Sequence, residues 1–219
     1  MDRRRLNRVL AIAGAVLAAP LFAPQLLAFP YSTKIGQDHI WSTAPISIST
    51  MRNILTDANG RVAESPLAVG SEGRDIFLTD GGWRWLWLAN TTKGSFALTR
   101  PVNESVIVNQ SDLGTGLVTN NTSVGGKRTL ASVIAHEKCH GMIRRHFGIA
   151  TDFVKPQWLR EGYCDHVAQK SSLTDQDVAA LKAAGKDHPA LPYYFGRKRV
   201  EANLAANGGN VERLFDEAR

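Results

Sequence analysis

The sequence lacks repeats, low-complexity stretches and internal linkers, and only two of its 219 residues are cysteine. Two cysteines allow at most one intramolecular disulfide, which excludes a framework of several bridges. Without linkers or repeats, the chain suits one globular domain plus an N-terminal extension, since about 100–200 residues per domain is usual. A hydrophobic content of 43% is ordinary for a folded protein and is sufficient for a core.

A strongly basic surface is also lacking once the N-terminus is set aside. The net charge is +6, but four arginines between positions 3 and 8 supply much of it. The remainder is only mildly basic, and the basic run at 197–199 is typical of a solvated helix face. We therefore expect no nucleic-acid partner.

The early arginines precede a long apolar segment at residues 9–29. A basic start followed by an apolar stretch is typical of an export signal, so residues 1–28 are expected to be a signal peptide, with a cleavage site after Ala28, or a membrane anchor. The stretch is long enough to span a bilayer, although Pro20 and Pro24 disfavour a regular helix. The positive-inside rule predicts a domain outside the cytoplasm in both cases, periplasmic or extracellular, and either released or tethered to the inner membrane.

Apolar periodicity and turn residues predict strands first and helices afterwards. Strands are expected at 75–79, 95–99 and 105–109, and helices at 46–58, 127–147, 158–168, 172–184, 192–206 and 210–218. The segment 83–89 fits either a strand or a helix, and we expect its tryptophans to lie in the core. This order favours an α+β domain over residues 29–219 rather than a wound parallel sheet.

The helix predicted at 127–147 carries the motif His-Glu-x-x-His at residues 136–140. At about 100° per residue, His136 and His140 lie one turn apart on the same helix face. Two imidazoles so placed can bind one zinc ion, and Glu137 beside them can hold a water on that metal. A chance match to this motif has a probability on the order of 1%.

A hydrolytic zinc site needs a third protein ligand and an open position for water. Glu161 lies on the next predicted helix, with 20 residues between it and His140. Asp165 follows one turn later on the same face as Glu161. A ligating histidine usually donates its other ring N–H to a carboxylate, and Asp165 is placed to accept from His136.

This combination of motifs resembles a known family. His-Glu-x-x-His, followed on a later helix by Trp-Leu-x-Glu-Gly and by Asp four residues after that Glu, is similar to the gluzincins, the thermolysin-like zinc metallopeptidases of the peptidase MA clan. The resemblance covers roughly residues 130–168, with a weaker echo at 194–214. It implies a zincin-like α+β fold, with a small N-terminal mixed sheet followed by an active-site helix and a mainly helical C-terminal part.

The resemblance implies an enzyme, a zinc peptidase acting on a peptide or protein substrate. One Zn²⁺ per chain would be held by His136, His140 and Glu161, with Asp165 behind one of the histidines. Glu137 would be the catalytic base that activates a zinc-bound water and then passes the proton to the leaving amine.

Two further roles are implied by the family. Such enzymes place a Tyr or His to stabilise the developing oxyanion, and the candidates here are His188, Tyr193 and Tyr194. Family members also bind the substrate backbone along an edge strand that precedes the metal helix. The strand at 105–109 is the candidate, with an interior position as the alternative.

The two cysteines, Cys139 and Cys164, lie in the two segments assigned to the metal site. In an oxidising compartment they could form a disulfide and staple the site, if the two helices pack side by side. The alternative is two small, separate, buried side chains. Zinc ligation by either cysteine is disfavoured.

Two other functions stay open at this point. One is a zinc-bound domain of the same fold that serves binding or assembly without catalysis, and the other is a cell-wall amidase with the same metal chemistry. The intact Glu137 favours an enzyme, because a structural zinc site has no need of that carboxylate.

Overall fold

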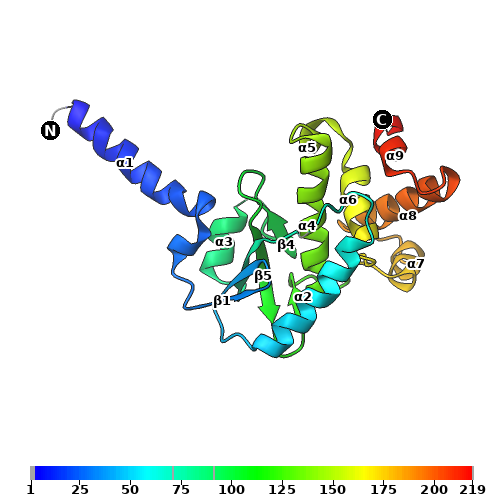
Figure 1. The fold of residues 1–219 in the computed structure, drawn as a ribbon, viewed down its shortest axis with the longest axis horizontal. Helices are drawn as coiled ribbons and strands as arrows, with labels where there is room; N and C mark the ends of the chain where they lie inside the picture. Colours follow the sequence, from blue (N-terminus) through cyan, green and yellow to red (C-terminus); the bar gives the residue numbers. More distant parts are fainter. Residues whose placement is uncertain (1–2, 71, 91, 219) are drawn as a thin grey trace.

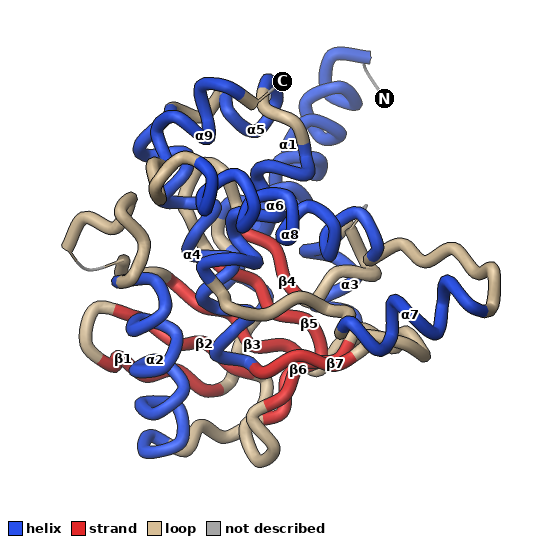
Figure 2. The backbone as a smooth tube through the Cα atoms, turned by 90° about the vertical axis from the view of Figure 1, so that its right-hand side faces the viewer, coloured by secondary structure: helices blue, strands red, loops and turns tan. Residues whose placement is uncertain are grey.

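A computed structural model describes residues 3–70, 72–90 and 92–218 as a mixed sheet with helices around it (Figures 1 and 2). The strands are β1 (Tyr31–Ile35), β2 (Asp38–Ser42), β3 (Asp75–Thr79), β4 (Ala97–Thr99), β5 (Val106–Asp112), β6 (Leu117–Thr119) and β7 (Lys127–Thr129). The helices are α1 (Arg3–Phe22), the short 3-10 helix η1 (Pro24–Leu27), α2 (Ile48–Ala63), α3 (Trp83–Ala89), α4 (Leu130–Phe147), α5 (Thr151–Val154), α6 (Gln157–Val167), α7 (Asp175–Ala183), α8 (Leu191–Ala206) and α9 (Val211–Glu217). The sheet comes from the first part of the chain and helices follow it, which confirms the α+β prediction.

The sheet is mixed, with the strand order β1-β2-β3-β5-β6-β7 and with β4 paired to β5. β2, β3 and β5 run parallel, and the other pairs are antiparallel. Side chains alternate between the two faces of β3, as the period of a strand requires. Ile76 and Leu78 join the main core with α2 and α4, whereas Phe77 joins a second cluster with α3. The sheet therefore has an apolar layer on both faces.

The edge of the sheet next to α4 is β4 rather than β5. Ile107 of β5 pairs with Phe77 of β3 on one side and with Leu98 of β4 on the other. The expectation of an edge strand at 105–109 is therefore wrong, and the interior alternative is correct. Among the described strands, β4 pairs with β5 alone.

Helix α4, which carries the His-Glu-x-x-His motif, lies at the centre of the molecule (Figure 1). Its N-cap is Thr129, whose hydroxyl accepts a hydrogen bond from the Ser132 amide, and it ends at Gly148 with φ +86°. Residues 127–129 were predicted as its first turn but instead form β7, because they pair with β6. Nearly all of α4 is buried, as expected for a helix enclosed by other elements.

The tryptophan-rich segment is a helix, α3, and its tryptophans divide between two faces. Trp85 is buried, and its indole N–H donates to the Lys93 carbonyl. Trp83 and Trp87 are 57% and 41% exposed. The prediction that these side chains lie in the core is therefore correct for Trp85 and wrong for the other two.

The C-terminal helices cover one side of α4. In Figure 2, α6, α8 and α9 gather above the strands. α6 and α8 cross very closely at two glycines. A Cβ atom added to Gly162 would lie 2.4 Å from the backbone carbon of Gly196. Because Gly162 follows Glu161, this crossing brings α8 beside the predicted third ligand.

The N-terminal helix α1 projects away from the rest of the molecule (Figure 1). Among the described residues, it is the one helix long and apolar enough to cross a membrane, a property that signal sequences share. Pro20 lies in its last turn without interrupting it, but the helix ends at Phe22, and a 3-10 helix begins at Pro24, so the expected irregularity is found at Pro24 and not at Pro20. The structure thus shows a segment suited to a signal sequence or an anchor.

Candidate metal centre

His136, His140 and Glu161 form a group that could bind a metal ion, with their ligand atoms within 4.8 Å of one another. Oε2 of Glu161 lies 3.2 Å from Nε2 of His136 and 3.6 Å from Nε2 of His140. The histidines are brought together by the helical period of α4, and Glu161 is supplied by α6, which packs against α4. The three predicted ligands therefore converge.

Behind this group, Asp165 fixes the orientation of one imidazole. Its Oδ1 atom lies 2.8 Å from Nδ1 of His136, so that Nε2 of the same ring faces Glu161. Oδ1 also accepts a hydrogen bond of 2.9 Å from Nη1 of Arg128, whose Nη2 donates to the Lys170 carbonyl. Asp165 thus lies behind His136 as predicted, whereas the contribution of Arg128 from β7 has no local signal in the sequence.

The ionisable groups of the cluster shift one another's pKa values. Burial alone would lower the pKa of His136, but its hydrogen bonds with Asp165 and Glu161 outweigh burial and raise that pKa well above 6.5. Burial also opposes the rise at His140, where the nearby Cys164 and Glu161 raise the pKa. Burial would raise the pKa of Glu161, yet the two histidines hold it well below 4.5. The cluster therefore favours positive charge between its side chains, which a metal cation would supply.

Glu137 lies beside the cluster and is buried at 6% exposure. The Thr99 hydroxyl lies 2.7 Å from Glu137 Oε2 and 2.9 Å from the Glu137 carbonyl oxygen. Thr99 is the last residue of β4, so the edge strand holds the carboxylate of the motif. Sequence reasoning missed this contact, because it joins residues 38 positions apart.

A cleft of about 760 Å³ opens over the cluster. His136, Glu137, His140 and Glu161 all lie on its wall, together with residues 94–99 before and within β4. The other walls come from the 120–125 loop, from the 152–160 segment and from the start of α8. The four residues with predicted chemical roles therefore share one open space with the free edge of the sheet.

The three oxyanion candidates separate in the structure. Tyr193 and His188 line the cleft, whereas Tyr194 lies outside it and donates a 2.8 Å hydrogen bond to Asp175. Tyr193 accepts a hydrogen bond of 3.1 Å from Gln157 Nε2. Burial and, secondarily, the charge of Glu161 raise the pKa of Tyr193, so its hydroxyl keeps its proton. Tyr193 is therefore the candidate best suited to donate into the cleft.

The cysteines lie behind the metal-binding side of α4 and α6. Cys139 and Cys164 are both free thiols and are fully buried. Burial raises the pKa of each thiol. Both thiols are free in the structure, yet the packing of α4 against α6 brings them into contact with each other, so they are not the separate side chains of the alternative. Neither belongs to the ligand group.

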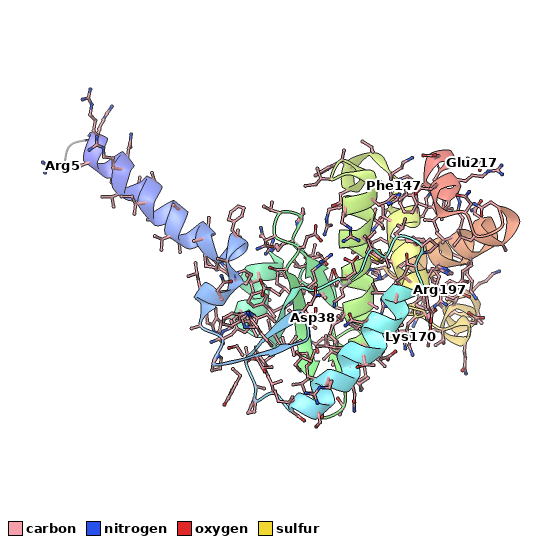
Figure 3. The ribbon with its side chains drawn as sticks, in the orientation of Figure 1. Arg5, Asp38, Phe147, Lys170, Arg197 and Glu217 are labelled. Carbon is pink, nitrogen blue, oxygen red and sulfur yellow. The ribbon has the colours of Figure 1, made fainter. Side chains whose placement is uncertain are left out.

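On the far side of α4 from the cleft, the motif residue Lys138 is completely buried. Its Nζ atom lies 2.7 and 2.9 Å from the two carboxylate oxygens of Asp38 and donates to Asn59 Oδ1 at 2.7 Å. Asp38, from β2, occupies the interior of the molecule (Figure 3). This ion pair ties the motif helix to the sheet and to α2.

Two other histidines lie away from the ligand group. His146 pairs with Glu212, and His166 lies 3.8 Å from Glu201.

Comparison of the chain with protein-family models, with curated proteins and with solved structures finds no match. The site must therefore be interpreted from its own geometry.

Proposed function

We propose that this protein is a zinc metallopeptidase that hydrolyses peptide bonds outside the cytoplasm. The single observation that carries the proposal is the position of Glu137, a carboxylate on the wall of the cleft beside a group of two imidazoles and one carboxylate. The resemblance to the gluzincins supports the same assignment. The basic start and the apolar α1 support the location.

The residues present fit zinc. A tetrahedral ion with ligand bonds of roughly 2.0–2.1 Å separates neighbouring ligand atoms by roughly 3.4 Å. The two imidazole nitrogens lie 3.2 and 3.6 Å from the Glu161 oxygen, which spans that value. Asp165 holds the tautomer of His136 that presents Nε2 as a ligand. When bound, zinc would supply Lewis acidity toward the scissile carbonyl and toward water.

The protein groups then have separate tasks. Glu137 accepts the proton of the attacking water and delivers it to the leaving amine. Thr99 keeps the Glu137 carboxylate in place through the 2.7 Å hydrogen bond. The Tyr193 hydroxyl donates a hydrogen bond to the oxygen that gains negative charge, and Gln157 holds the tyrosine from behind.

The substrate backbone would lie along β4. This strand has one unpaired edge among the described strands, and residues 95–99 line the cleft. An extended peptide can add to such an edge through main-chain hydrogen bonds. It would then pass directly over Glu137, because Thr99 of β4 contacts that residue.

The test compares four forms of the full-length protein on a defined peptide library, with cleavage products identified by mass spectrometry. The wild type and the control Glu217→Gln should cleave equally, because Glu217 is an exposed residue at the C-terminal end (Figure 3). Glu137→Gln should lose at least about 10²-fold in rate, the contribution of a general base. Its zinc content should stay near one ion per chain, while His140→Ala should lose the metal.

Other outcomes would support other functions. Zinc without cleavage of peptides or cell-wall fragments would indicate a binding or assembly domain. Cleavage of cell-wall fragments alone would indicate an amidase. A wild-type protein without zinc would contradict the proposal.

A further inference from the structure

The chain that follows α1 is built into the folded domain. Leu27 and Phe29 are 9% and 8% exposed and belong to the second apolar cluster. The ring of Phe29 lies 5.2 Å from that of Phe77 in β3. The link between α1 and the domain is therefore a packed segment rather than a loose tether.

Polar contacts fix the same link. Nε and Nη2 of Arg84, on α3, donate to the carbonyls of Leu27 and Ala28 at 2.8 and 3.0 Å. Nδ2 of Asn103 donates to the carbonyl of Phe22, the last residue of α1, at 2.6 Å. These bonds hold the C-terminal end of α1 against α3 and the turn after β4.

Cleavage after Ala28 would disrupt this packing. It would remove Leu27 from the apolar cluster and take both carbonyl acceptors from Arg84. It would also create a charged ammonium group at Phe29, beside buried aromatic rings, where an unpaired charge is costly. The fold therefore favours a chain that keeps α1.

The surface where α1 leaves the domain is apolar. We call it the exit face, and its exposed members are Phe22, Leu26, Trp83, Leu86, Trp87 and Val102. Their exposed fractions run from 41% at Trp87 to 77% at Val102. An exposed apolar group of this kind marks an interaction surface, and tryptophan is enriched at the boundary between lipid and water.

The geometry points to a bilayer as the partner: we propose that α1 is retained as a membrane anchor and that the exit face rests in the lipid headgroup region around it. Two observations select lipid as the occupant. The exit face surrounds the C-terminal end of α1, a helix long and apolar enough to cross a membrane. The basic end of α1, marked by Arg5, lies at the far end from the domain (Figure 3).

This arrangement sets the distance between the cleft and the membrane. Pro101 lines the cleft and directly precedes Val102 of the exit face. The rim of the cleft therefore lies close to the bilayer, and a membrane-proximal chain would reach β4 most easily.

Tryptophan fluorescence tests the proposal, because α1 contains no tryptophan. The full chain is reconstituted into vesicles of phosphatidylcholine with a minority of phosphatidylglycerol, with or without bromine on the acyl chains. Brominated lipid should quench the wild type. The double variant Trp83→Ser, Trp87→Ser should still float with the vesicles but show quenching reduced by about twofold or more, since tryptophan at the interface is lost.

The matched control is Trp158→Phe. Trp158 lies in the C-terminal helices. The guanidinium carbon of Arg199 lies over its indole ring, 3.7 Å from the ring centroid. Its replacement should leave quenching unchanged. Intact mass of the vesicle-bound chain should show that residues before Phe29 are still present.

Three results would overturn the proposal. The first is equal emission of the wild type in brominated and plain vesicles, and the second is equal quenching of the wild type and the double variant. A membrane-derived chain that begins at Phe29 is the third. Absent quenching, together with cross-linking between copies through Trp83→Cys, would assign the exit face to a second copy of the chain.

Discussion

Nδ1 of His136 and Oδ1 of Asp165 lie 2.8 Å apart in the interior of the protein. The same carboxylate oxygen also accepts from Arg128, while Oδ2 has no hydrogen-bond partner among the described residues. One oxygen atom therefore carries both contacts. The hydrogen bond from Arg128 fixes the position of that oxygen. Through this oxygen, Arg128 also fixes the direction in which His136 presents Nε2.

Replacing Arg128 should weaken metal binding although Arg128 is not a ligand. In Arg128→Met, Asp165 loses its second partner and holds His136 less firmly, so zinc affinity should fall by about 10–100-fold, the usual effect of such outer contacts. Competition with a chromogenic chelator measures the change. Arg128→Lys should restore part of it, and Arg197→Met should have no effect, because Arg197 pairs with Glu201 on α8 and does not line the cleft. Unchanged affinity in a folded Arg128→Met protein would contradict this role.

The two neighbouring tyrosines provide a matched pair for the oxyanion role. Tyr193→Phe should lower kcat by about 10²–10³-fold with little change in KM, because a donor to the developing charge acts in the transition state. Tyr194→Phe should leave both constants unchanged, since Tyr194 lies outside the cleft and donates to Asp175. Steady-state kinetics on one cleaved peptide provide the measurement. Equal effects of the two substitutions would remove Tyr193 from the mechanism.

The ligand group could be predicted from the sequence because it depends on local helical periodicity. His136 and His140 share a face of α4, as Glu161 and Asp165 share a face of α6, whatever surrounds these helices. Only the packing of α4 against α6 had to be supplied by the fold. The predicted strand at 75–79 coincides with β3 for a similar reason, since its apolar run is local.

Contacts that depend on long-range pairing could not be predicted. Arg128 reaches Asp165 because β7 pairs with β6, whereas local periodicity predicts residues 127–129 as the first turn of the metal-binding helix. Thr99 reaches Glu137 because β4, rather than β5, is the edge of the sheet. β1 was missed because it is largely exposed and lacks a clear apolar alternation.

The pKa shifts predict how pH acts on the metal-free protein. The pKa values of His136 and His140 are raised above 6.5, so the stability from their protonated forms is complete below about pH 6.5 and is lost as pH rises through the raised values. The pKa values of Glu161 and Asp165 are lowered, so their contributions are present above about pH 4.5 and are lost as pH falls. Thermal unfolding of the metal-free protein should show greatest stability between these limits.

Zinc binding should have the opposite dependence on the histidines, because a ligand imidazole must be neutral. Apparent zinc affinity should rise with pH through neutrality, by about tenfold per pH unit for each proton displaced. Calorimetric titration in two buffers of different ionisation enthalpy counts the released protons. Binding without proton release near pH 7 would contradict the predicted imidazole ligands.

The buried ion pair behind the motif helix should matter for stability more than for chemistry. Burial lowers the pKa of Lys138 while Asp38 opposes that change, so the lysine depends on its carboxylate partner. Asp38→Ala leaves the ammonium group buried and unpaired and should lower the free energy of unfolding by about 3–5 kcal/mol. Removing both charges in Asp38→Leu, Lys138→Met should recover much of this loss, because two apolar side chains need no partner.

Urea unfolding of the wild type, Asp38→Leu, Lys138→Met and the double variant gives the coupling between Lys138 and Asp38. The exposed pair of Arg213 and Glu217 is the control, and its removal should change stability little. The folded double variant should keep zinc and peptide cleavage, because Lys138 faces away from the cleft toward β2 and α2. Loss of cleavage in a double variant that still binds zinc would show that this ion pair also sets the position of Glu137, the neighbour of Lys138 in the motif.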